Sequence, residues 1–162
     1  MNAGPYSDEK VQSFLSEHFI TIKSQCFWNK QTELMKQFNI KWTPTLFVLD
    51  KRGIKHHRVL GYVPVDDLLA HLWLGRGKVF FDADNFTLAI DSFRTIIERH
   101  PDAGVSPEAV YLLGVAEYKK NHDSSALRRA YDTLRERYPQ SEWFRRAEPY
   151  STIPAFAELH QI

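Results

Sequence analysis

Cys26 is the side chain best suited to covalent chemistry in this chain of 162 residues, and it is the only cysteine. A cysteine thiolate attacks disulfides, but thiol–disulfide exchange normally uses a second cysteine to resolve the mixed disulfide. A lone cysteine also excludes an intramolecular disulfide and a cysteine-rich metal site. We therefore expect Cys26, beside Phe27 and Trp28, to be a packed or loop thiol without a catalytic role.

His56 and His57 are the only adjacent histidines. Adjacent residues of a strand point to opposite faces, so this pair cannot ligate one metal ion together. The sequence also has no phosphate-binding loop and no Gly-x-Ser-x-Gly nucleophile motif. We expect no metal, no cofactor and no catalytic residue.

Arginines near the end of the chain suggest an anion-binding patch, but acidic residues are interleaved with them. The arginines are Arg128, Arg129, Arg135, Arg137, Arg145 and Arg146, and the acids are Asp132, Glu136 and Glu142. A solvated helix face is therefore expected. The net charge of +1 gives no field that favours nucleic acid or an anionic membrane. No apolar run reaches the length of a membrane span and no signal peptide is visible, which predicts a soluble, cytoplasmic protein.

The elements that position these residues differ between the two halves of the chain. In the first half, apolar residues recur at helical spacing in some segments and β-branched residues cluster in others. The predicted elements are a helix over 8–17, a strand over 19–23, a helix over 30–38, strands over 45–49 and 54–60 joined by a tight turn, and a helix over 65–81. The strands at 19–23 and 45–49 should be parallel and joined by a right-handed crossover.

Pro44 opens the strand at 45–49, where its missing N–H costs no ladder hydrogen bond. The stretch Trp42-Thr43-Pro44-Thr45, followed by this strand and a Lys51-Arg52-Gly53 turn, resembles the cis-proline loop of the thioredoxin superfamily. The resemblance covers residues 6–74. It implies a thioredoxin-like domain in which the Thr43–Pro44 bond is cis and the backbone of this loop faces a bound thiol or peptide.

The sequence departs from that family near Tyr6. Family members carry a strand and a Trp-Cys-x-x-Cys helix start before the equivalent of Tyr6, and only five residues precede it here. In the family, the missing strand lies between the strands predicted at 19–23 and 45–49. Three alternatives follow: these two strands pair directly, a second copy covers the exposed edges in a homodimer, or the chain is a fragment of a longer oxidoreductase.

A near-constant spacing relates two parts of the second half. The equivalent residues are a glycine, an alanine and a helix-ending proline, 37 or 38 positions apart: Gly77 and Gly114, Ala89 and Ala126, and Pro101 and Pro139. This pattern resembles tetratricopeptide repeats over about residues 70–150. It implies two helical hairpins, which supply binding surfaces for protein or peptide partners instead of chemistry.

Two repeats are fewer than the three or so that usually stand alone, so their ends need cover. We expect the helix over 65–81 to be shared by both halves, with Gly75 and Gly77 as kinks. Ser106 should cap the third repeat helix, and a helix over 141–147 should cover the second repeat with Trp143 or Phe144.

Tyr111, Tyr118 and Tyr131 are the candidate lining of a peptide groove between the repeat helices, and packing between repeats explains them equally well. No other residue of the repeats points to a particular partner.

The sequence thus predicts an α/β plus α fold, with a truncated thioredoxin-like βαββα sheet that continues through a shared helix into two tetratricopeptide-like hairpins. The predicted domains are residues 1–74, residues 70–150 with the capping helix, and an irregular tail over 151–162. The predicted function is a redox-inactive protein-interaction module that forms a homodimer. The alternative is a fragment of a thiol–disulfide oxidoreductase whose Cys-x-x-Cys segment is encoded upstream of Met1.

Overall fold

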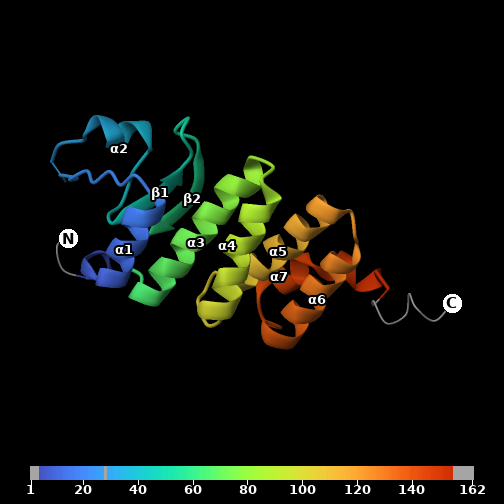
Figure 1. Ribbon diagram of the computed structural model, residues 1–162. Coiled ribbons are helices and arrows are strands. Elements are labelled where there is room, and N and C mark those ends of the chain that lie inside the picture. The colour runs from blue at the N-terminus through green and yellow to red at the C-terminus, as the bar shows by residue number, and fades with distance from the viewer. Residues whose placement is uncertain (1–3, 28, 155–162) are drawn as a thin grey trace. The chain divides into compact units, whose positions relative to one another are not determined.

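The computed structural model describes residues 4–27 and 29–154, and Figure 1 traces the chain from its N-terminus to its C-terminus. Two compact units are present, Met1–Leu69 and Ala70–Ile162. The boundary between them falls within helix α3, Val65–Asp82. The helix predicted to be shared by both halves therefore begins in the first unit and ends in the second.

The first unit begins with a 3-10 turn, η1 (Pro5–Ser7), and helix α1 (Glu9–His18). The side chain of Asp8 caps α1 by accepting a hydrogen bond of 2.9 Å from the N–H of Lys10. Val11 and Phe14 lie on the buried face of α1, as the helical spacing predicts.

The strand predicted over residues 19–23 is absent, and so is the parallel crossover that it would begin. These residues form neither helix nor strand, and the side chains of Ile20 and Ile22 are 97% and 83% exposed. A β-branched run becomes a strand only when a neighbouring strand accepts and donates its backbone hydrogen bonds. No described strand does so here, because the sheet contains only two strands, which pair with each other.

The second predicted helix is also shorter than expected. Helix α2 covers only Glu33–Gln37 within the predicted range of 30–38, and Thr32 caps it by accepting from the N–H of Met35. None of the α2 residues is buried. A helix of this length gains little stability from packing, so its ends are not held in helical form.

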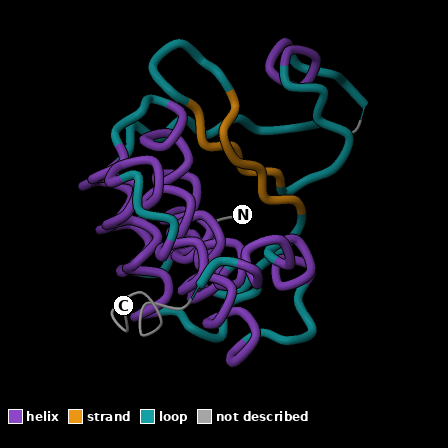
Figure 2. The backbone as a smooth tube through the Cα atoms, turned by 90° about the vertical axis from the view of Figure 1, so that its right-hand side faces the viewer, coloured by secondary structure: helices purple, strands orange, loops and turns teal. Residues whose placement is uncertain are grey.

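Strands β1 (Thr45–Leu49) and β2 (Lys55–Leu60) form the predicted antiparallel hairpin, shown in orange in Figure 2. Its turn passes through Gly53, whose φ of +79° favours glycine. Val48 and Val59 are buried in the hairpin. The ring of Phe38, the residue that follows α2, stacks on Phe47 of β1 with centroids 5.4 Å apart.

The second unit consists of helical hairpins (Figure 1). Residues of α3 pair with α4 (Phe86–Arg99), and α5 (Ser106–Asn121) pairs with α6 (Ser125–Arg137). Phe93, Ile96 and Leu134 are fully buried between these helices. Helices α4 and α6 end at Arg99 and Arg137, two residues before Pro101 and Pro139, as the repeat pattern predicts.

The two repeat glycines serve the close approach of paired helices. A Cβ atom on Gly77 would lie 2.4 Å from Cε1 of Phe93, and one on Gly114 would lie 2.5 Å from Cβ of Ala130. Neither distance is compatible with a side chain. Gly77, predicted as a kink, is therefore a packing position within the continuous helix α3.

Ser106 is not the helix cap that the sequence suggested. Helix α5 has Val105 at the cap position and no side-chain cap, and Ser106 is its first residue. The Ser106 hydroxyl instead donates a buried hydrogen bond of 2.6 Å to the carbonyl of His100. It thus ties the start of α5 to the end of α4, which a cap would not do.

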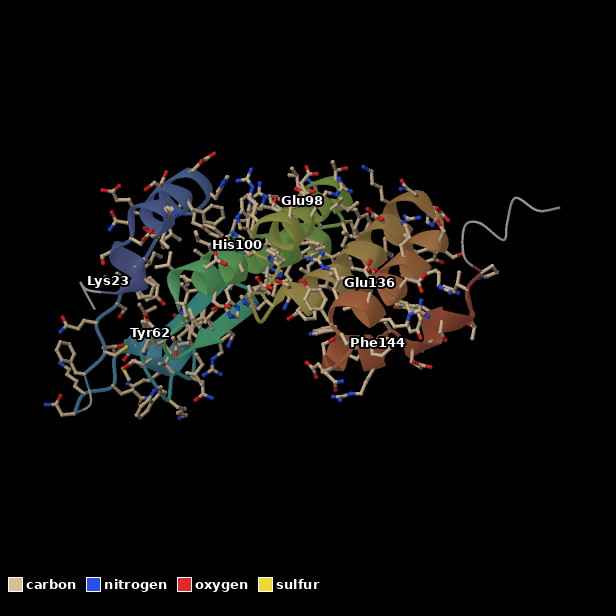
Figure 3. The ribbon with its side chains drawn as sticks, turned by 90° about the horizontal axis from the view of Figure 1, so that it is seen from below. Lys23, Tyr62, Glu98, His100, Glu136 and Phe144 are labelled. Carbon is tan, nitrogen blue, oxygen red and sulfur yellow. The ribbon has the colours of Figure 1, made fainter. Side chains whose placement is uncertain are left out.

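A short helix covers the second repeat, as predicted. Helix α7 (Glu142–Arg146) is capped by Ser141, whose hydroxyl accepts from the N–H of Phe144. Phe144, labelled in Figure 3, lies against Tyr131 with ring centroids 5.5 Å apart. The tail is less irregular than predicted, because a 3-10 helix, η2 (Glu148–Thr152), follows. The rest of the predicted tail, 155–162, lies outside the described residues.

Candidate functional site

The loop of Trp42, Thr43 and Pro44 is held by the hairpin that follows it. The Thr43–Pro44 bond is cis. The carbonyl of Pro44 accepts a hydrogen bond of 2.8 Å from the N–H of Gly61, and the Thr45 hydroxyl donates to the carbonyl of Trp42 at 2.7 Å. Trp42 is 57% exposed, so this loop presents a large aromatic side chain at the surface.

Cys26 lies beside this loop. The residues that line one small hollow are Cys26, Phe27, Met35, Lys41, Trp42 and Thr43. Cys26 is a half-buried free thiol, and Trp28, its neighbour in sequence, lies outside the described residues. A single thiol at this hollow can form a mixed disulfide but has no second thiol in the chain to release it.

The histidine pair is part of the hairpin. His56 has a side chain that is 5% exposed, with its Nε2 atom 3.5 Å from Oδ2 of Asp50, while His57 lies opposite Val48 in the ladder. Within residues 4–27 and 29–154 no group of three or more histidine, cysteine or acidic side chains could hold a metal ion.

Asp50 is the polar centre of the hairpin turn. Its carboxylate accepts hydrogen bonds of 2.9 Å from the N–H groups of Arg52 and Ile54 and pairs with the Arg52 guanidinium. Burial alone would raise the pKa of Asp50, but the bonds from Ile54, Arg52 and His56 outweigh it and hold that pKa well below its usual range. The carboxylate thus closes the turn in its charged form.

Two of the three candidate tyrosines, Tyr131 and Tyr111, belong to one apolar cluster with residues of α7. Tyr131 is 8% exposed in the core beneath α7. Tyr111 packs between Trp143 and Tyr150, and the Tyr111 and Tyr150 hydroxyls lie 2.9 Å apart. Burial and this hydrogen bond raise the pKa of Tyr150. Of the three, only Tyr118, at 37% exposed, is open to a partner.

Three of the six arginines pair with the interleaved acids. Arg128 and Arg135 both contact Asp132, and Arg146 pairs with Glu142. Arg128 has a further role that sequence reasoning missed, because its guanidinium donates to the carbonyls of Ser151 and Ile153. It fixes the segment after the repeats.

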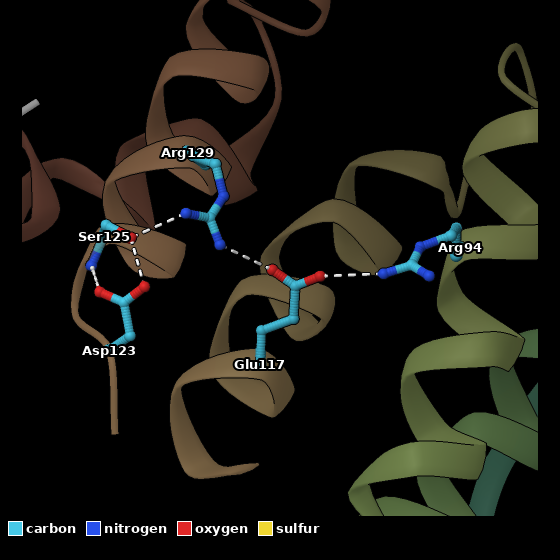
Figure 4. A network of polar contacts seen from close by, with 5 residues as sticks. All are labelled: Arg94, Glu117, Asp123, Ser125 and Arg129. Atoms are coloured by element: carbon cyan, nitrogen blue, oxygen red, sulfur yellow. Dashed lines mark hydrogen bonds and ion pairs between the residues drawn. The ribbon is translucent and has the colours of Figure 1, made fainter. Parts of the chain in front are cut away.

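Sequence reasoning also missed a polar network across the repeats (Figure 4). Glu117 of α5 receives hydrogen bonds of 3.1 Å from Arg94 of α4 and from Arg129 of α6. Arg129 also donates to the hydroxyl of Ser125, which in turn donates to Asp123. Bonds from the Ser125 hydroxyl and N–H hold the pKa of Asp123 below its usual value.

In the first repeat, residues of other types occupy the positions equivalent to Glu117 and Arg129. Phe80 and Ser92 stand 37 residues before Glu117 and Arg129. In the first repeat Arg76 donates to the Ser92 hydroxyl at 2.7 Å and lies over the Phe80 ring, 4.8 Å from its centroid. Both positions thus have different residue types in the two repeats, and this difference can be read from the sequence.

Exposed apolar side chains gather in the first unit. Those that are large and at least one third exposed are Ile20, Ile22, Phe27, Leu34, Trp42, Ile54, Leu60 and Tyr62, the last labelled in Figure 3. In the described part of the second unit, Tyr118 alone falls in this class. None of the described helices is both long and apolar enough to cross a membrane.

Comparison with known families agrees with this division of the chain. The thioredoxin-like domain family matches residues 6–74, and the tetratricopeptide repeat family matches residues 72–103 and 108–141. Searches of curated proteins and of solved structures found no match. With the hairpin and its loop in one unit and the paired helices in the other, the chain consists of a thioredoxin-like domain followed by tetratricopeptide repeats.

Proposed function

We propose that this chain is a protein-interaction module that does not catalyse dithiol–disulfide exchange. A thioredoxin-like domain and tetratricopeptide repeats fit an interaction module. The observation that carries the second part of the proposal is the hollow beside Trp42 and Thr43, which contains Cys26 and no other thiol. The single thiol beside this loop therefore does not provide for a full catalytic cycle.

The test is the reduction of insulin by dithiothreitol in the presence of the purified chain. We expect the wild-type chain to give the same rate as a Cys26→Ser variant and as dithiothreitol alone. A wild-type rate clearly above that of Cys26→Ser would show that Cys26 turns over, and would reject the proposal.

The second candidate is a thiol–disulfide oxidoreductase of which this chain is a part. The match of the thioredoxin-like family and the retained loop at Trp42, Thr43 and Pro44 favour it. The coding DNA upstream of Met1 separates the two candidates. An in-frame strand and Trp-Cys-x-x-Cys within about forty codons would support the oxidoreductase, since these are the elements that precede the loop in that family. A stop codon directly upstream would support the interaction module.

A further inference from the structure

The hairpin leaves one apolar edge of β1 without a strand. The N–H of Gly61 donates to the carbonyl of Pro44, and Thr45 lies opposite Leu60. In an antiparallel ladder this makes Thr45 and Leu60 a non-hydrogen-bonded pair, and Phe47 and Arg58 form the next such pair. The backbone N–H and C=O groups of Thr45 and Phe47 therefore point away from β2.

The two strands of the hairpin differ in composition. Strand β2 contains Lys55 and Arg58, whose charged groups lie over the Phe47 ring of β1. Strand β1, Thr45–Leu49, contains no charged residue of its own. Charged residues along a strand oppose the addition of another strand, so the residues of β1 oppose it less than those of β2.

The same unit contains a segment after α1 that forms neither helix nor strand. Phe19 follows α1 with φ −138° and ψ 149°, which are strand values. In the described part of the chain no hydrogen bond joins Ile20, Thr21 or Ile22 to another residue. The almost complete exposure of Ile20 and Ile22 makes this the most apolar open segment of the unit.

We propose that two copies of this chain associate by laying residues 20–22 of each copy along the outer edge of β1 of the other. The unpaired segment and the unpaired edge complement each other, yet within one copy they do not pair. A reciprocal exchange satisfies both features in both copies through a closed two-fold arrangement. The net charge of +1 adds little repulsion between copies.

The experiment is light scattering over a hundredfold range of concentration, combined with amide hydrogen exchange. At high concentration we expect twice the chain mass of 18.9 kDa and exchange of the Thr45 and Phe47 amides slowed about tenfold or more. An Ile20→Lys, Ile22→Lys double variant should stay at single mass and lose this slowing. Both side chains are exposed in the single copy, so the substitutions should not unfold it.

Leu60→Lys is the matched control, because Leu60 is 53% exposed at the opposite edge of the hairpin. It should keep the double mass. A wild-type mass of 18.9 kDa at the highest concentration overturns the inference. So does a dimer that survives the double lysine substitution, or one that Leu60→Lys disrupts equally. The insulin assay is independent of these outcomes, so a failure here leaves the proposed function standing.

Discussion

The two units use their apolar residues in opposite ways. Most buried hydrophobic residues of the described chain lie in the second unit, whereas every large exposed one except Tyr118 lies in the first. Each repeat helix meets its partner helix only a few residues later, so local contacts suffice to close the core. The hairpin of the first unit has only two strands, and two strands alone bury little. The first unit therefore leaves at its surface the kind of side chain that the second unit packs into its core.

The largest effect on stability is expected for a substitution in the core of the second unit. Phe93 is fully buried, so Phe93→Ala should lower the free energy of unfolding by about 3–5 kcal/mol. Ile20→Ala should change it by less than about 0.5 kcal/mol in dilute solution, since Ile20 is 97% exposed. Urea unfolding followed by circular dichroism measures both. Equal losses of unfolding free energy at Phe93 and Ile20 would show that the two units do not differ in how they bury these side chains.

A smaller effect concerns the glycine on which helix pairing depends. Gly114→Val should cost about 1–3 kcal/mol, because its Cβ would lie 2.5 Å from Ala130. Gly104→Val is the control, since nothing lies within 4 Å of a Cβ there. Thermal unfolding compares them. A Gly114→Val variant as stable as Gly104→Val would mean that the paired helices can separate freely.

A still smaller effect on stability is expected for substitutions in the polar network around Glu117. Glu117→Phe alone should destabilise the second unit by up to about 1 kcal/mol, because it removes two half-exposed ion pairs. Adding Arg129→Ser places the residues of the first repeat at both positions, but Leu113 stands where the first repeat has Arg76. We expect Arg129→Ser to cost less after Glu117→Phe than alone in a double-mutant cycle, because its ion pair with Glu117 is then already absent. Additive losses would show that the two positions are not coupled.

In the first unit, Asp50 should give an effect that depends on pH. Its pKa is lower in the folded chain than in the unfolded chain, so its stabilisation is present above about pH 4 and is lost as pH falls toward the folded value. The gap in thermal stability between wild type and Asp50→Asn should therefore narrow below about pH 4. A titration of the Ile54 amide by NMR gives the pKa directly. A midpoint near 4 would contradict the hydrogen-bond assignment.

Patterns that depend on neighbours in sequence were predicted correctly. Helix α1 forms within one residue of its predicted bounds, the hairpin forms around the turn at 51–53, and the repeat prolines follow the ends of α4 and α6. In each case the pattern is set by residues only a few positions apart. The spacing of 37 likewise predicted both helical hairpins, because each repeat is one local unit.

Features that depend on a distant partner were not predicted. The segment around Ile20 and Ile22 has the composition of a strand, but a strand exists only beside another strand. Ser106 has the sequence of a cap, yet its hydroxyl is drawn to the carbonyl of His100. The bonds of Glu117 join three helices, and no local pattern says which helices meet. The loop at Pro44 was predicted from the resemblance to a known family and not from the composition of the sequence.

The ion pair between Arg94 and Glu117 also gives the two repeats a fixed order. Glu117 takes one of its partners from the repeat before it. The residue equivalent to Arg94 in the second repeat is Tyr131, 37 positions later, and Tyr131 is covered by Phe144. An engineer who lengthened the array by duplicating the second repeat would place the new glutamate against tyrosine instead of arginine. A longer array that keeps this ion pair between repeats would need an arginine at position 131.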